Sequence, residues 1–208
     1  MYALVESGNI TKIFHNPQGF KLGDNQYSAD VFTKWSNSER EAIGIYAVTI
    51  DNTNKKNEKW YTNTNQSFTY DASAKTVTAT YGTATAKAHA DTNWTQTEID
   101  NGDAPTGATT STVKTEGLKT ELIRDLKKDV SRILSETDWY VIRNSEKSTA
   151  IPSNITTHRD AVRTKQAEME TAITNAADTA ALETLYTYTE QEDGTATRPL
   201  GELPELES

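Results

Sequence analysis

Short hydrophobic runs with strand-like alternation occupy the first part of the chain. The runs that predict strands are residues 2–5, 10–14, 45–50, 60–61, 68–70 and 77–81. Ser36 and Glu39 have the spacing of a helix capping box, which predicts a short helix that ends before Gly44. Residues 71–75 have the composition of a hairpin loop. Because most aromatic residues also lie here, residues 1–87 predict a small β-rich domain.

Hydrophobic residues become scarce between residues 88 and 114. Thr, Ala, Asn, Asp and Gly dominate, and only Trp94, Ile99 and Val113 are clearly apolar. A composition of this kind predicts a polar linker arm. We expect the arm to be disordered in the isolated chain and ordered against other subunits.

A helical pattern then begins at residue 118. One stripe of the predicted helix 118–135 consists of Leu118, Leu122, Leu126, Val130, Ile133 and Leu134. The stripe of a second helix, from about residue 155 to residue 176, consists of Ile155, His158, Val162, Met169 and Ile173. Ser153 or Asn154 is expected to cap this second helix. The two patterns predict a helical hairpin.

A third short helix is predicted after Asp178, which is placed to cap it, with Leu182 and Leu185 on its apolar side. Residues 115–188 therefore form the predicted helical domain. Residues 189–208 are rich in acids, Pro and Gly and predict an extended acidic tail. The whole pattern indicates an α+β fold.

Composition limits what such a chain can do. Of its 208 residues 35% are hydrophobic, and the mean hydropathy is −0.71, which predicts a modest core supported by partners. There is no cysteine, so disulfides and thiolate metal sites are excluded. No apolar run approaches the roughly 18 residues of a membrane span, and no leader pattern follows Met1.

The net charge of −9 is unevenly distributed. Residues 1–87 carry nine Lys and Arg against eight Asp and Glu, whereas residues 88–208 carry twelve against twenty-two. The first part is therefore at +1 and the second at −10. Nucleic acids and anionic membranes require basic surfaces, so neither is an expected partner.

Candidate catalytic residues are sparse. His15, His89 and His158 lie in three different kinds of segment without metal-ligand spacing, and the chain has no phosphate loop or nucleophile elbow. Glu136, Asp138 and Glu146 could form a general acid/base pair, but helix-end and solvated positions explain them better. The sequence predicts neither an enzyme nor a cofactor.

The most informative stretch joins the two long helical patterns. Trp139 follows the end of the first stripe, and its indole is expected to fold back over Leu134, which would contribute roughly 2–3 kcal/mol. Arg159 and Arg163 are four residues apart on one helical face, where Asp138 or Glu146 could accept their hydrogen bonds. Pro152 fits the extended segment before a helix. This joint is predicted to be structural.

The same residues carry a family resemblance. LSETDW at residues 134–139, Pro152 and HRDAVR at residues 158–163 resemble the carboxy-terminal motif of bacteriophage tail fibre assembly chaperones and related tail proteins. YVIR at residues 140–143, which ends in Arg143, resembles the insertion seen in the marine and cyanobacterial phage type. His158 replaces the usual aromatic residue. The resemblance covers about residues 115–175 and, more loosely, the amino-terminal half.

The resemblance implies a structural joint for assembly, without catalysis. Its residues are Asp138, Trp139, Arg143, Pro152, Arg159 and Arg163. The implied role is a component of the tail (baseplate, fibre or adaptor) that holds other tail proteins, with a transient assembly chaperone as the alternative. The implied partners are other tail proteins and copies of the chain in a cyclic homo-oligomer. The implied location is the virion, after assembly in the host cytoplasm.

Overall fold

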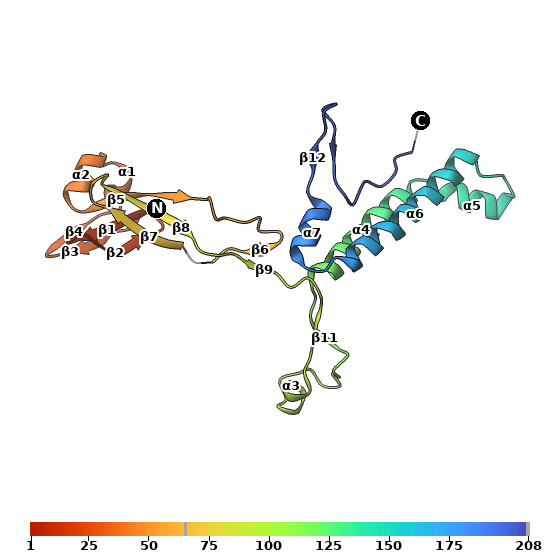
Figure 1. Cartoon of the computed structure of the whole chain (residues 1–208), viewed down its shortest axis with the longest axis horizontal. Helices are drawn as coiled ribbons and strands as arrows, with labels where there is room; N and C mark the ends of the chain where they lie inside the picture. The colour runs from red at the N-terminus through yellow and green to blue at the C-terminus, as the bar shows by residue number, and fades with distance from the viewer. Residues whose placement is uncertain (65, 207–208) are drawn as a thin grey trace. The chain divides into compact units, whose positions relative to one another are not determined.

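The computed structural model describes residues 1–64 and 66–206, and the chain forms two compact units, Met1–Thr85 and Ala86–Ser208 (Figure 1). Strands dominate the first unit and helices the second. The predicted α+β class is confirmed. The segment that was predicted as a linker arm belongs to the second unit.

A five-stranded sheet forms the centre of the first unit. Its strand order is β2-β1-β5-β8-β7, with the strands β1 (Tyr2–Glu6), β2 (Asn9–Phe14), β5 (Ile45–Asp51), β7 (Gln66–Asp71) and β8 (Thr76–Tyr81). Neighbours are antiparallel except for β5 and β8, which are parallel. The loop between β7 and β8 is fixed by Asp71, whose Oδ1 accepts from the amides of Ser73 and Ala74. The hairpin predicted here is confirmed.

One face of this sheet is covered by elements that the sequence only partly predicted. They are the strands β3 (Phe20–Leu22) and β4 (Asn25–Tyr27) and the helices α1 (Asp30–Thr33) and α2 (Asn37–Ala42). The core beneath them consists of Leu4, Phe14, Phe20, Val31, Phe32 and Ile45. The capping box is confirmed, because Ser36 Oγ accepts from Glu39 N and Glu39 Oε2 accepts from Ser36 N. Gly44 ends the turn with φ of +77°, where a Cβ would lie 2.5 Å from the Val5 carbonyl oxygen.

The opposite face of the sheet has a thinner core. Ala3, Val5 and Val77 are buried there, and half-buried residues such as Tyr46 and Tyr70 pack around them. The rings of the two tyrosines lie 4.9 Å apart, and their hydrogen bond raises the pKa of Tyr46 to about 12, with partial burial as a second cause. The short strands β6 (Tyr61–Thr62) and β9 (Thr85–Ala86) form a separate two-stranded sheet.

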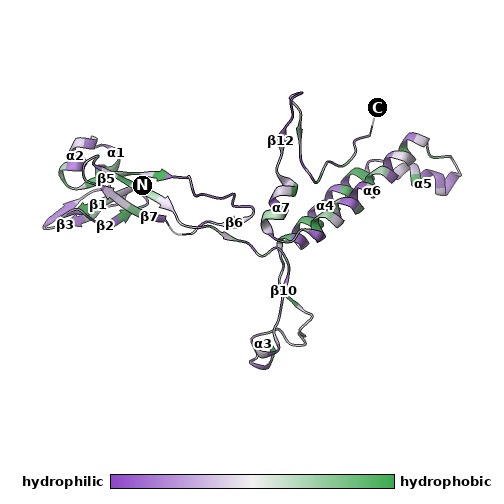
Figure 2. Cartoon of the chain, in the orientation of Figure 1, coloured by the Kyte–Doolittle hydropathy of each residue, from purple (hydrophilic) through white to green (hydrophobic). Residues whose placement is uncertain are grey.

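The second unit is built on a helical hairpin of α4 (Leu118–Ser135) and α6 (Ser153–Asn175), which run side by side in opposite directions (Figure 1). Hydrophobic and hydrophilic residues alternate along both helices (Figure 2). The buried residues of α4 and α6 are Leu118, Leu122, Leu126, Val130, Ile155, His158, Arg159, Val162, Met169 and Ile173. Both predicted stripes are therefore in the core, although Ile133 and Leu134 are only half buried.

Two further helices flank the hairpin. The helix α7 (Thr179–Tyr186) begins at Asp178, whose Oδ1 accepts from Ala181 N, as predicted. The helix α5 (Asp138–Lys147) occupies the joint, where no helix was predicted. It was missed because most of its residues are weak helix formers and none of them is buried, so no apolar stripe marks it in the sequence. The N-cap of α6 is Pro152 rather than Ser153 or Asn154.

The carboxy-terminal tail is more ordered than predicted. Strands β12 (Thr189–Glu190) and β13 (Ala196–Thr197) form a small hairpin. Leu200 is then buried, and its amide donates to the Leu185 carbonyl of α7. A single leucine in an acidic segment gives no periodic signal, so the sequence did not reveal this anchor.

The start of the predicted arm lies on the amino terminus of α4. The amides of Leu118 and Lys119 donate to the carbonyls of Ala88 and His89, each at 3.0 Å, and so these helix-start donors are satisfied by backbone. Gly117 permits this approach, because a Cβ there would lie 2.3 Å from the carbonyl carbon of Ala90.

The remainder of the arm has a local structure of its own. Strands β10 (Thr92–Asn93) and β11 (Val113–Thr115) pair, and α3 (Gln96–Asp100) follows β10. A second capping box joins Thr95 and Glu98 at the start of α3. Composition predicted an arm without regular structure, because the strand pair and the capping box are built from polar side chains. The expected disorder of the isolated arm stays a prediction.

Candidate functional site

Arg159 of α6 is the centre of the joint between the helices. The residue is 9% exposed, which is unusual for arginine. Nη1 donates to the Leu134 carbonyl oxygen and to Thr137 Oγ1, both at 2.7 Å, and Nη2 donates to Asp138 Oδ1 at 2.9 Å. One guanidinium therefore links α6 to the end of α4, to the turn and to the start of α5.

The chemistry of the turn explains this arrangement. The last carbonyls of a helix lack intrahelical donors and carry partial negative charge, so a cation near them is favourable. The Leu134 carbonyl accepts from the Thr137 amide, the Thr137 hydroxyl and Arg159. Asp138, in the first turn of α5, places its carboxylate where the helix dipole favours negative charge. The joint thus fixes the angle at which three helices meet.

The expected pairing of Arg159 is confirmed, and its acceptor is Asp138 rather than Glu146. Thr137, which is only 3% exposed, was missed as a functional residue. Its hydroxyl both accepts from Arg159 and donates to Leu134, so it is saturated within the joint. A polar residue directly between two helical patterns was the available signal.

The predicted burial of Trp139 is wrong. Its side chain is 50% exposed, and it stacks on neighbours of its own helix instead of covering Leu134. The Tyr140 ring lies 4.0 Å away, centroid to centroid, and the Arg143 guanidinium lies 4.6 Å from the Trp139 ring. The physical reason is α5 itself, because a new helix begins at Asp138 and the indole packs against Tyr140 and Arg143 of that helix.

The other predicted joint residues have separate positions. Arg163 is exposed and pairs at 3.4 Å with Asp160 of its own helix, so it is not part of the joint. Arg143 lies over the Trp139 and Tyr140 rings. Pro152 is the N-cap of α6, with φ of −54° and ψ of 139°. The structure therefore brings Asp138 and Arg159 together and leaves Trp139 and Arg143 on an outer surface.

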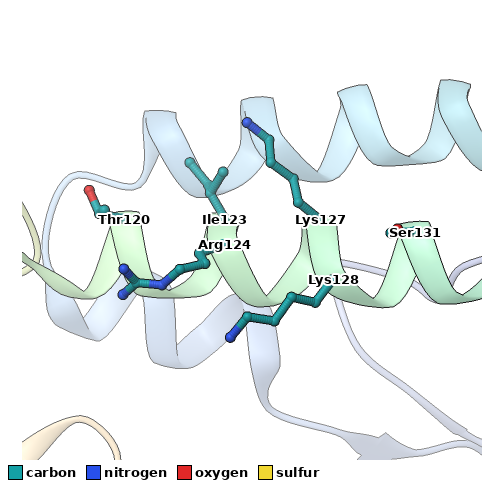
Figure 3. A pocket seen from close by; sticks show the side chains of 6 residues that line it. All are labelled: Thr120, Ile123, Arg124, Lys127, Lys128 and Ser131. Carbon is teal, nitrogen blue, oxygen red and sulfur yellow. The ribbon is translucent and has the colours of Figure 1, made fainter.

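A shallow groove of about 540 Å³ lies along α4 (Figure 3). Its lining residues are Thr120, Ile123, Arg124, Lys127, Lys128 and Ser131. Figure 3 shows Ile123 and Lys127 extending toward α6, whereas Arg124 and Lys128 extend away from it. The three cations are paired with Glu116, Glu170 and Asp125 of the same chain. The groove therefore has a small apolar floor, and the three cations beside it already have ion-pair partners.

Within residues 1–64 and 66–206, no group of three or more His, Asp or Glu side chains could hold a metal ion. The carboxylate of Asp138 is engaged by Arg159, and Glu136 lies near Arg132 at 3.8 Å. In the same described part, no helix is long and apolar enough to cross a bilayer. What the joint can do is hold helices at a set angle.

No family model, curated protein or solved structure matches this chain.

Proposed function

We propose that the chain is a structural component of a bacteriophage tail, in the baseplate, a fibre or an adaptor, and that it holds other tail proteins. The observation that carries the proposal is the buried Arg159 guanidinium with its bonds to Leu134, Thr137 and Asp138. We call Arg159 and its three acceptor residues, Leu134, Thr137 and Asp138, the polar lock. All four belong to the stretches that resemble the carboxy-terminal motif of phage tail proteins.

A joint of this kind supports a holding role. Loss of a buried charge-assisted hydrogen bond is costly, so the three helices are held at a fixed geometry. Fixed elements present binding surfaces at a low entropic cost, which is what a permanent component needs. The partners under this proposal are other tail proteins and copies of the chain in a cyclic homo-oligomer, within a virion assembled in the host cytoplasm.

One observation favours a second candidate, a transient tail fibre assembly chaperone. The helix α5 exposes Trp139 and Ile142, which are one turn apart on the same helical side. Exposed apolar side chains that lie together are suited to temporary contact with unassembled proteins. The two candidates share the fold and differ in whether the chain stays in the finished particle.

Quantitative mass spectrometry of purified virions distinguishes the candidates. A tail component is expected in purified particles at a fixed copy number relative to the major tail proteins, and to resist high-salt washing. A chaperone is expected in infected cells and absent from the particles. Absence from both infected cells and particles contradicts the phage tail proposal altogether.

A further inference from the structure

The helix α5 has an unusual composition for its position. It contains Trp139, Tyr140, Val141 and Ile142, yet none of its ten residues is buried. A helix of this length is marginal in water, and tertiary packing of an apolar face normally supplies its stability. Half of the Trp139 side chain and more than half of that of Ile142 face solvent. The helix therefore has an apolar face that the rest of the described chain does not cover.

Helical spacing places four residues on this face. Trp139, Ile142, Arg143 and Glu146 follow the i, i+3, i+4, i+7 pattern of one helical side. The face combines a large aromatic residue, an aliphatic residue, a cation and an anion. Trp and Arg are also the residue types most enriched where protein interfaces gain their binding energy.

Arg143 lacks a polar partner. Its guanidinium lies over the Trp139 and Tyr140 rings, and its Nε is buried without a hydrogen-bond acceptor in the described chain. Glu146, one turn further on, forms no ion pair with any described residue. The Nη atoms of Arg143 have no acceptor in the described chain either, and the side chain is half buried, so a carboxylate from another molecule that reaches these atoms would stabilise the guanidinium.

We infer that the Trp139–Glu146 face of α5 binds the same face of a second copy of this chain, with the two α5 helices antiparallel about a two-fold axis near Ile142 and Arg143. In that register Trp139 of one copy packs beside Glu146 of the other. Each Arg143 then lies within reach of the other copy's Glu146, so the face supplies its own missing carboxylate. Antiparallel helix dipoles add a favourable term. The inference stands on α5 alone and does not depend on the proposed function.

The size of the face sets the strength of this contact. The exposed half of a tryptophan is about 100 Å², and the exposed part of Ile142 is smaller. Two copies therefore bury far less than the roughly 1,200 Å² at the lower end of stable interfaces. We expect a weak contact in dilute solution that strengthens when many copies are held together, because tethering raises the effective concentration.

Cysteine cross-linking tests a weak two-fold contact directly, because the chain contains no cysteine. The variant Ile142→Cys places a thiol next to the proposed axis. Ile50→Cys and Val113→Cys are matched controls, since these side chains are 44% and 43% exposed and lie elsewhere. Under a mild oxidant, the full-length Ile142→Cys chain is expected to form disulfide dimers at least tenfold faster than either control. Equal rates for the three variants overturn the inference.

Charge exchange tests the orientation. In the Ile142→Cys background, Arg143→Glu alone and Glu146→Arg alone each place like charges opposite one another, so both are expected to lose most of the cross-linking. An equimolar mixture of the two variants restores both ion pairs and is expected to form the heterodimer at the original rate. Failure of the mixture to recover rejects the antiparallel register. Circular dichroism at 222 nm confirms that each variant keeps its helices.

Discussion

The two units of this chain differ in how many of their large hydrophobic side chains are exposed. In the first unit, Phe14, Val31 and Ile45 are fully buried among other aromatic and aliphatic side chains. Exposed large hydrophobic side chains in the described chain comprise Ile50 in that unit and Val113, Trp139, Val141, Ile142, Tyr188 and Leu206 in the second. The first unit thus completes its own core, whereas the second leaves apolar surface for contact with other molecules.

The largest effect is expected from damage to the self-contained core. Phe14→Ala removes a fully buried ring that contacts Phe20 and Phe32, so we expect a loss of about 3–5 kcal/mol in the stability of the first unit. His15→Ala, at the neighbouring exposed position, is the control. Chemical denaturation is followed by tryptophan fluorescence in a Trp94→Phe, Trp139→Phe background, so that the signal comes from Trp35 and Trp60 of the first unit.

The same variant also tests whether the two units unfold independently. Helical ellipticity at 222 nm reports chiefly on α4 to α7, all of which belong to the second unit. If the units are independent, Phe14→Ala leaves the midpoint of this signal unchanged. A parallel loss of ellipticity would mean that the second unit depends on the first.

The second effect concerns the polar lock of the helical unit. Arg159→Ala removes the donor to Thr137 Oγ1 and to Asp138 Oδ1 and one of the donors to the Leu134 carbonyl. We expect a loss of about 3 kcal/mol in the stability of the helical unit, measured by denaturation at 222 nm. Arg159→Lys should recover only part of this loss, because one ammonium cannot match the planar fork of guanidinium. Arg163→Ala is the control and is expected to change stability by less than about 0.5 kcal/mol. Equal effects of the two alanine variants would contradict the lock.

Removal of the exposed tryptophan is expected to have a smaller effect. Trp139→Ala should lower the stability of the helical unit by less than about 1 kcal/mol, because half of the side chain already faces solvent. Fully buried large aromatic residues cost about 3–5 kcal/mol when truncated to alanine. A loss in that higher range, measured in dilute solution at 222 nm, would show that the indole is covered after all.

The regular parts of the fold could be predicted because they depend on local periodicity. Steps of three and four residues located α4 and α6, and the capping residues Ser36 and Asp178 located two helix starts. The strands β3 and β4 were missed because three-residue strands contain too little alternation to recognise. The contact of Leu118 and Lys119 with residues 88–89 joins segments distant in sequence through backbone atoms, which leave no mark on residue types.

The candidate site was predicted only in part, for a related reason. The pairing of Arg159 with Asp138 could be anticipated from charge and helical spacing. The position of Trp139 depends on whether residues after Thr137 form a helix or a loop. The apolar stripe of α4, which ends near Leu134, is compatible with either conformation, so the sequence did not decide between them. Trp139 was predicted to be buried because it is large and apolar, but an apolar side chain on an outer surface is also what an interface requires.

The smallest expected effect concerns the stability of the arm alone. Its composition predicts disorder in the isolated chain, whereas the structure shows it ordered around Glu98. The Glu98 carboxylate is bound by Lys114 and by the amide and hydroxyl of Thr95, which together lower the pKa of Glu98 to about 2. Because the pKa in the folded arm lies below the ordinary value of 4.5, the ionised carboxylate stabilises the arm above that pH. This stabilisation is lost as the pH falls through about 2.

An NMR titration of the Glu98 side-chain carboxyl carbon measures this pKa in the isolated chain. We expect a midpoint far below 4.5 for Glu98. Glu98→Gln keeps an acceptor for the Thr95 amide and removes only the charge that binds Lys114, so it isolates the ion pair. Lys114 also lies 4.8 Å from the Trp94 ring, and Trp94 emission should change in this variant. An ordinary pKa for Glu98 would mean that the free arm is disordered, as its composition predicts, and that partners create its structure.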